Sequence, residues 1–193
     1  MGSRTKSLTS MTKQTITRKG TFDSGHRVMN ERLKCFNLHG HTYLYELTFV
    51  FSSMEAIGYA IDFKEIKRVG CQWIDDVLDH GTIVNPHDKS VIQACFETGS
   101  KMWTMSLNGP REYCNPSVEN LAKEMFLGIS FLMDTVNLKL ASVCLYETPN
   151  CFTVCASSSI SDIERYNFLR VNRTDLETYK DAKGVVEYDD RRV

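Results

Sequence analysis

The sequence predicts an α+β fold in which two antiparallel pairs of strands flank two helices along the chain. Apolar and polar residues alternate with a period of two in four segments, and this alternation indicates strands. The four segments are residues 14–28, 41–52, 138–147 and 152–157. Apolar residues recur with helical spacing at 62–80 and again from 117 to about 134. The stretch between the two helices predicts a short helix at 88–97 and a short strand at 101–107.

Turn and cap residues support these boundaries. A ten-residue polar loop joins the first two strands, and a Thr-Pro-Asn turn at 148–150 joins the last two, so each pair predicts an antiparallel hairpin. Asp62 followed by Glu65 matches a capping box at the start of the first helix, and Ser117 begins the second helix in a similar way. Gly81 predicts the C-terminal cap of the first helix.

The length and charge distribution predict one folded domain with an extension at each end. We expect residues 1–11 to form a flexible basic arm, residues 12–157 the domain, and residues 158–193 a charged C-terminal extension. Residues 173–193 include eleven charged side chains of both signs. This composition predicts a tail that is mobile or wraps a neighbouring subunit.

The composition argues against several classes of protein. The 193 residues are 42% hydrophobic with a net charge of −1, so the chain lacks the basic field that binds nucleic acid or an anionic membrane. No apolar run approaches the roughly 20 residues of a spanning helix, and no secretory signal precedes the domain. We therefore expect a cytoplasmic protein. Seven cysteines without a CxxC pair argue against a disulfide framework.

Three of the five histidines lie in the stretch FDSGHRVMNERLKCFNLHGHTY, residues 22–43. His39 and His41 are two residues apart on a predicted strand, so their side chains share one face. The predicted hairpin brings His26, near the end of the first strand, beside His41. Three converging imidazoles suit a catalytic zinc ion with three protein ligands and one open position.

Cys35 lies in the loop between these histidines and allows two interpretations. As a fourth ligand it would close the coordination shell and make a structural zinc site. As a thiolate beside a cation it would serve as a general base. The spacing leaves both interpretations open, and we favour the base.

Ordered motifs extend along the chain from residue 15 to about 155. They are Phe22-Asp-Ser-Gly-His26, Cys35-Phe-Asn-Leu-His39-Gly-His41-x-Tyr43, Ala60-Ile-Asp-Phe63, Leu78-Asp-His80, Asn115-Pro-Ser-Val-Glu-Asn-Leu-Ala122 and Val143-Cys-Leu-Tyr-Glu-Thr148. In this order they resemble the 6-pyruvoyl-tetrahydropterin synthase and 6-carboxytetrahydropterin synthase family. The resemblance implies the tunnelling fold (T-fold), an antiparallel four-stranded sheet with two helices on one face. Trimers of this fold close into a barrel, and two trimers stack into a homo-hexamer.

The resemblance also implies roles for individual residues. The protein would be a lyase acting on 7,8-dihydroneopterin triphosphate, with Zn²⁺ bound by His26, His39 and His41. Cys35 would be the catalytic base, and His80, oriented by Asp79, would be the proton donor or relay.

Three further residues would bind the substrate. Glu147 would accept hydrogen bonds from the 2-amino group and ring N–H of the pterin, because a carboxylate matches that two-donor edge. Ser117 and Glu119 would help to form the pterin pocket. Glu119 and the Asp79-His80 pair can also be interpreted as ordinary helix-end residues. Glu147 is harder to interpret structurally, because a carboxylate at the end of an apolar strand needs a partner.

The spacing of three residues between Cys35 and His39 resembles the bacterial 6-carboxytetrahydropterin branch. That branch releases acetaldehyde and triphosphate on the way to 7-deazaguanine compounds such as queuosine precursors. The alternative within the family is the pyruvoyl branch, which eliminates triphosphate and keeps the three-carbon side chain. The alternative of another class is a non-catalytic zinc- or pterin-binding protein.

Three departures from the family pattern bear on the choice of substrate side chain. Gly81 stands where relatives often have a larger residue, and Ser117 stands where threonine is usual. The segment at about 87–114 is an insertion relative to compact members of the family.

Overall fold

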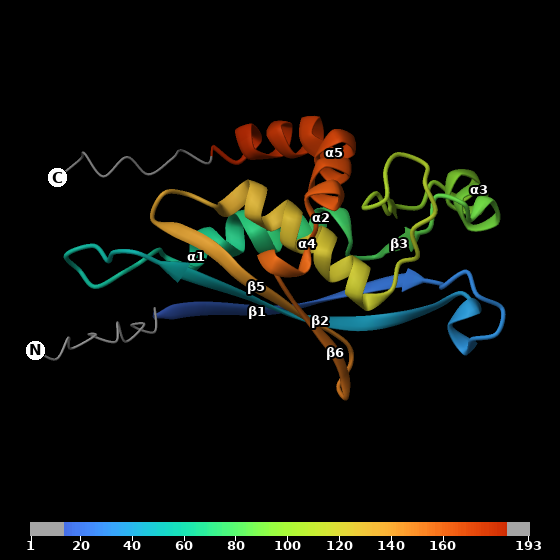
Figure 1. Ribbon diagram of the computed structural model, residues 1–193, viewed down its shortest axis with the longest axis horizontal. Coiled ribbons are helices and arrows are strands. Elements are labelled where there is room, and N and C mark those ends of the chain that lie inside the picture. Colours follow the sequence, from blue (N-terminus) through green and yellow to red (C-terminus); the bar gives the residue numbers. More distant parts are fainter. Residues whose placement is uncertain (1–13, 185–193) are drawn as a thin grey trace, which may run out of the picture.

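The computed structural model describes residues 14–184. The predicted basic arm at 1–11 lies outside this range, as do residues 185–193 of the predicted C-terminal extension. The described residues form a six-stranded mixed sheet with helices on one face (Figure 1). None of the helices in this range is both long and apolar enough to cross a bilayer.

The strands follow the order β4-β3-β1-β2-β5-β6 across the sheet. Its antiparallel centre consists of β1 (Thr15–His26), β2 (His39–Phe51), β5 (Leu138–Thr148) and β6 (Cys151–Ala156), which confirms the four long predicted strands. Beyond β1, the short strands β3 (Gly81–Val84) and β4 (Met102–Thr104) add in parallel. The sequence pattern does not predict β3, because four residues are too few to show a period.

Helices cover one face of the sheet in two layers (Figure 1). The inner layer consists of α1 (Phe63–Ile66), a π-helical stretch (Lys67–Cys71), α2 (Gln72–Val77) and α4 (Val118–Met133). The outer layer is α5 (Asp162–Ala182), while α3 (Lys89–Thr98) stands beyond the end of the sheet. Asp62 and Ser117 cap α1 and α4 as predicted.

The inner helices α2 and α4 pack closely against each other because one position on α4 has no side chain. A Cβ atom at Gly128 would lie 2.5 Å from the indole ring of Trp73 on α2. Only glycine allows this approach. Trp73 belongs to the same hydrophobic cluster as the strand side chains Phe22 and Tyr43, which are 2% and 0% exposed.

The turn after α2 differs from the prediction. Gly81 is the first residue of β3, so its predicted role as a helix cap is wrong. His80 takes the left-handed conformation instead, with φ 55°. Its backbone N–H donates to the carbonyl oxygen of Asp23 on β1 at 2.7 Å. A left-handed non-glycine residue costs roughly 1–2 kcal/mol, and this hydrogen bond to the neighbouring strand helps to offset that cost.

The C-terminal extension includes a long helix that completes the core. Ser161 and Glu164 form a capping box at the start of α5. Phe168 and Leu176 are 0% and 2% exposed and pack into the main hydrophobic cluster. The prediction of a mobile or subunit-wrapping tail is therefore wrong for residues 173–184. Two buried apolar residues eight positions apart, among many charges, give too weak a period to predict a helix.

Glu124 on α4 holds the segment that contains β4 against the core. Its buried carboxylate accepts hydrogen bonds from Trp103 Nε1 (2.5 Å), Ser106 Oγ (3.0 Å), the Leu107 N–H (3.1 Å) and the Ser106 N–H. Asn172 of α5 donates to the same Ser106 hydroxyl at 2.9 Å. Burial raises the pKa of Glu124 to about 7, although the four donors oppose this shift.

We expect Glu124 to make stability depend on pH. The ordinary pKa of a glutamate, 4.5, lies below the value in the folded protein, so between about pH 4.5 and 7 the folded protein binds more protons than the unfolded chain. The free energy of unfolding should fall as pH rises through this window, by up to about 3 kcal/mol. The Glu124→Gln variant should lack this component. Urea unfolding of both proteins across the window measures it, and parallel pH profiles would contradict the prediction.

Candidate metal centre and active site

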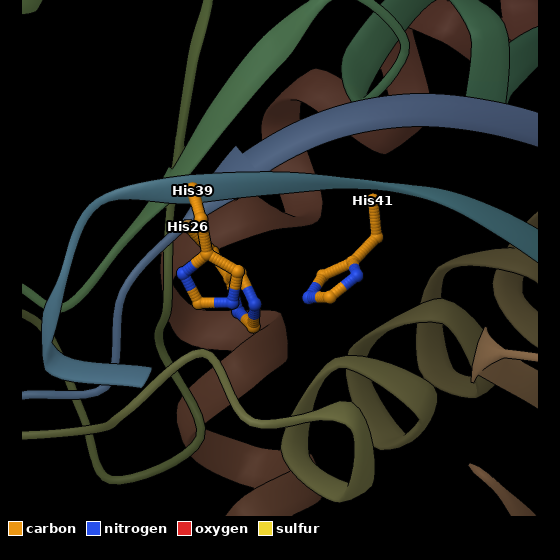
Figure 2. A group of neighbouring side chains, drawn as sticks. All are labelled: His26, His39 and His41. Atoms are coloured by element: carbon orange, nitrogen blue, oxygen red, sulfur yellow. The ribbon is translucent and has the colours of Figure 1, made fainter. Parts of the chain in front are cut away.

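The register of the β1–β2 hairpin brings His26, His39 and His41 together. His26 pairs with His39, and His41 lies two residues further along β2, so all three side chains share the helix-covered face. Each offers one ring nitrogen, and these nitrogens lie within 4.8 Å of one another. Figure 2 shows the rings converging from the two strands.

Backbone carbonyls fix the tautomers of two of these rings. His26 Nδ1 lies 2.7 Å from the carbonyl oxygen of Pro116, and His39 Nδ1 lies 2.6 Å from that of Asn37. A carbonyl oxygen only accepts, so Nδ1 carries the proton in both rings. The lone pair of each Nε2 is then free to bind a ligand, as in metal-binding histidines whose other nitrogen donates to a carbonyl.

The cluster fits a transition-metal ion. His26 Nε2 and His41 Nε2 are buried, and neither has a hydrogen-bond partner among residues 14–184. An unsatisfied buried polar atom costs about 1–3 kcal/mol, and metal coordination would satisfy both atoms. Burial lowers the pKa of His26 and of His41, so both stay neutral, which is the form that binds metal. Three imidazoles suit zinc and several other transition metals.

Glu147, at the end of β5, reaches the same cluster. Its Oε1 lies 3.3 Å from His26 Nε2 and 3.7 Å from His41 Nε2. The carboxylate is mostly buried, with a side chain 22% exposed. In this position it can accept hydrogen bonds from a bound molecule or contribute to a metal's ligand set.

Cys35 lies in the loop between the two strands that carry the histidines. It lies in a single 3-10 turn, Lys34–Phe36, and its carbonyl oxygen accepts the N–H of Val28 at 2.8 Å. The hydroxyl of Tyr43 is buried. Burial raises the pKa of Tyr43 well above its usual range, and the charges of Glu147 and Cys35 add to the shift. Cys35 is not one of the residues whose ligand atoms form the three-histidine group, and its role as the base stays a prediction.

Asp79 and His80 form a hydrogen-bonded pair in the turn between α2 and β3. Asp79 Oδ2 lies 2.6 Å from His80 Nδ1, and Asp79 Oδ1 accepts the N–H of Asp23 at 2.7 Å. Burial would raise the pKa of Asp79, but these two hydrogen bonds and nearby Lys101 outweigh it and lower the pKa. The Asp23 side chain points away from the face that carries His26, because the two residues are three positions apart on β1.

An open depression of about 370 Å³ lies beside this pair, and its lining includes Asp23, Thr42 and His80 together with His41 of the histidine cluster. The His80 side chain is 79% exposed. In the part of the chain that the structure describes, no hydrogen bond or ion pair joins His80 to Cys35 or to the histidine cluster. The depression has both His41 and His80 in its lining, and the joint action of Cys35 and His80 stays a prediction.

Comparison with known proteins identifies the family. The family described as 6-pyruvoyl tetrahydropterin synthase matches residues 15–157. The chain belongs to this family. Membership confirms the resemblance and the expectation of a lyase. The family match ends before α5, so this helix is an addition to the part shared with the family.

A relative from Rickettsia felis, named 6-carboxy-5,6,7,8-tetrahydropterin synthase, is 38% identical over 70% of this chain and 95% of its own length. Two solved structures confirm the T-fold. An uncharacterised protein of Wolinella succinogenes aligns with a TM-score of 0.59 at 20% identity, over 75% of this chain and 98% of its own. The 6-pyruvoyl tetrahydropterin synthase of Caenorhabditis elegans aligns with a TM-score of 0.54 at 22% identity, over 76% of this chain and 97% of its own.

The other two predicted substrate residues of this family member lie at the start of α4. Ser117 Oγ accepts the N–H of Asn120 at 3.4 Å and so caps the helix. It directly follows Pro116, whose carbonyl orients His26. Glu119 is exposed in the first turn, and its side chain makes no hydrogen bond or ion pair within residues 14–184. Their roles in binding substrate stay predictions.

The structure adds polar residues around the site that sequence reasoning missed. Asp88 is buried in an ion pair with Arg27, directly after His26. The Asn115 side chain accepts hydrogen bonds from the Met29 N–H (2.9 Å) and from Asn85 Nδ2 (2.9 Å). The only local signal was the helix-start pattern at Asp88, which predicts a cap and gives no indication of Arg27.

Proposed function

We propose that this protein is a zinc-dependent carbon–carbon lyase. It converts 7,8-dihydroneopterin triphosphate and water into 6-carboxy-5,6,7,8-tetrahydropterin, acetaldehyde and triphosphate, in the biosynthesis of 7-deazaguanine (queuosine-type) precursors. The observation that carries the proposal is the cluster of three imidazoles with two unsatisfied Nε2 atoms, which lie 3.3 and 3.7 Å from Glu147 Oε1. Family membership and the printed names of the Rickettsia relatives support the choice of product.

Each residue of the cluster has a stated task in this proposal. His26, His39 and His41 hold the zinc ion, which when bound supplies positive charge to polarise oxygen atoms of the substrate side chain. Cys35, as thiolate, removes a proton from that side chain. Glu147 accepts the 2-amino and ring N–H donors of the pterin and so fixes its orientation.

Asp79 and His80 serve the site of a neighbouring subunit in this proposal. The His80 side chain is 79% exposed, and within residues 14–184 it makes no hydrogen bond to its own histidine cluster, which leaves the ring open to a neighbouring subunit. On the side of β1 away from β2, only residues 24–26 pair with β3. Among the described strands, residues 15–23 have no partner on that side. β6 is the other sheet edge. Two free edges favour closure into an oligomeric barrel, and we propose a homo-hexamer of two stacked trimers.

The mass of the product tests the proposed reaction. Incubation of the zinc-loaded protein with 7,8-dihydroneopterin triphosphate should yield the 6-carboxy product together with acetaldehyde. A product that keeps the three-carbon side chain after loss of triphosphate would assign the pyruvoyl reaction instead. Absence of both products from zinc-loaded protein would refute both reactions and favour a non-catalytic pterin-binding protein.

We expect Glu147→Gln to weaken substrate binding and leave the metal in place. The amide keeps the size of the side chain but loses the charge that strengthens two hydrogen bonds, and charge-assisted hydrogen bonds contribute about 1.5–3 kcal/mol. KM should therefore rise roughly tenfold to a hundredfold. Glu177→Gln, at an exposed position on α5, is the matched control. A loss of zinc in Glu147→Gln would show that the carboxylate is a metal ligand.

A further inference from the structure

The loop that carries Cys35 is attached to the segment at 87–114 by a buried ion pair. Arg27, next to His26, donates from Nε to Asp88 Oδ2 and from Nη2 to Asp88 Oδ1 at 2.6 Å. Asp88 is 1% exposed and also accepts the N–H of Val91, which caps α3. Two parallel hydrogen bonds fix the plane of the guanidinium, which a single bond would not.

Arg27 connects this ion pair to Cys35. The guanidinium carbon lies 5.1 Å from the centroid of the Phe36 ring, a cation–π contact with the residue that follows Cys35. From the other side, the Val28 N–H donates to the Cys35 carbonyl at 2.8 Å. The backbone around the thiol is therefore held by Arg27 and by its immediate neighbour.

A second attachment holds the same loop two residues further on. The Met29 N–H donates to Asn115 Oδ1 at 2.9 Å, and Tyr113 Oη donates to the Met29 carbonyl at 2.8 Å. The chain then continues to Pro116, whose carbonyl orients the His26 ring. The segment from Asp88 to Pro116 thus contacts both the loop with the thiol and a histidine of the cluster.

We propose that Arg27 and Asp88 are positioning residues, and that the segment at 87–114 clamps the Cys35 loop so that the thiol stays aligned with the histidine cluster. Asp88 is 1% exposed and its carboxylate already accepts hydrogen bonds from Arg27 and from the Val91 N–H, so it is not free to bind substrate. This inference rests on the proposed function, which assigns Cys35 as the base. It gives the inserted segment a task in the chemistry without placing any of its residues in contact with substrate.

Arg27→Lys and Asp88→Asn in the zinc-loaded protein test the clamp. Lysine keeps the charge but cannot make two parallel hydrogen bonds, and asparagine keeps the helix cap but removes the charge. Hydrogen exchange of the amides at 28–36 should become about tenfold faster or more, because the loop opens more often. kcat should fall about tenfold or more, because a displaced base reacts poorly. KM and zinc content should stay within about twofold of the parent protein.

Arg173→Lys, in an exposed ion pair on α5, is the matched control and should change none of these quantities. Unchanged exchange at 28–36 or an unchanged kcat in Arg27→Lys would overturn the proposal. Loss of zinc in parallel with kcat would also overturn it, since the pair would then support the metal centre. Arg27→Lys is the milder change and decides the matter if Asp88→Asn does not fold.

Combination with Cys35→Ala separates the clamp from the proposed function. In that background, Arg27→Lys should still accelerate exchange but should cause no further loss of the residual turnover, because the positioned group is gone. A further loss of tenfold would contradict the positioning role. Full turnover by Cys35→Ala alone would refute the assignment of the base, whereas unchanged exchange refutes the clamp itself.

Discussion

Replacing Cys35 with alanine is expected to lower kcat by a factor of about 10² to 10⁴, the usual contribution of a general base. The thiol belongs to the loop between the two strands that carry the histidines. Its removal deletes a proton acceptor and leaves every imidazole in place. Zinc content should therefore stay at the level of the parent protein, which metal analysis after gel filtration measures.

Cys151→Ala is the matched control for this experiment, because Cys151 is an exposed free thiol at the start of β6. It should retain full turnover and full zinc content. Loss of zinc from Cys35→Ala would identify Cys35 as a fourth ligand in a closed structural site, and the proposed chemistry would then be wrong.

Replacing His41 with alanine is expected to abolish both metal binding and turnover. Even changes to residues that only support metal ligands reduce affinity by about 10- to 100-fold, so loss of a ligand should weaken zinc binding by more than about 100-fold. His41 is the most suitable of the three for this test. Its ring is half-buried, whereas His26 is 0% exposed and donates to the Pro116 carbonyl, so loss of His26 would also disturb folding. Competition with a chromogenic chelator measures the affinity.

His87→Ala provides the control, because His87 is exposed and lies outside the cluster. It should bind zinc with the affinity of the parent protein. If His41→Ala retained zinc at parental affinity, the three-histidine site would be refuted, whatever the effect on turnover.

The histidine cluster could be predicted because it depends on local rules. A period of two aligns His39 with His41, and an antiparallel hairpin brings the end of β1 to the start of β2. Both rules operate within about thirty residues of chain. The four long strands and the two inner helices were predictable for the same reason, since each carries a periodic signal of its own.

Features that depend on distant parts of the chain could not be predicted. β3 consists of four residues that become a strand by pairing with the end of β1 and with β4. Helix α5 is recognisable only when Phe168 and Leu176 meet the core. The bond between Arg27 and Asp88 spans 61 positions, and no local pattern at either residue indicates the other. The prediction that Gly81 caps the helix failed for the same reason. The left-handed residue is His80, whose backbone N–H donates to the carbonyl oxygen of the distant residue Asp23.

The two groups of proposed catalytic residues meet β1 at Asp23 and at His26, an odd number of positions apart. Neighbouring positions on a strand face opposite ways, so this odd spacing turns the Asp23 side chain away from the side of the sheet that carries His26. Inserting or deleting one residue between them would turn His26 to the wrong side and break the cluster. Insertions and deletions among homologues should therefore be absent from this part of β1. They should occur instead in the loop at 27–38, where a change of one residue does not turn a side chain to the other face of a strand.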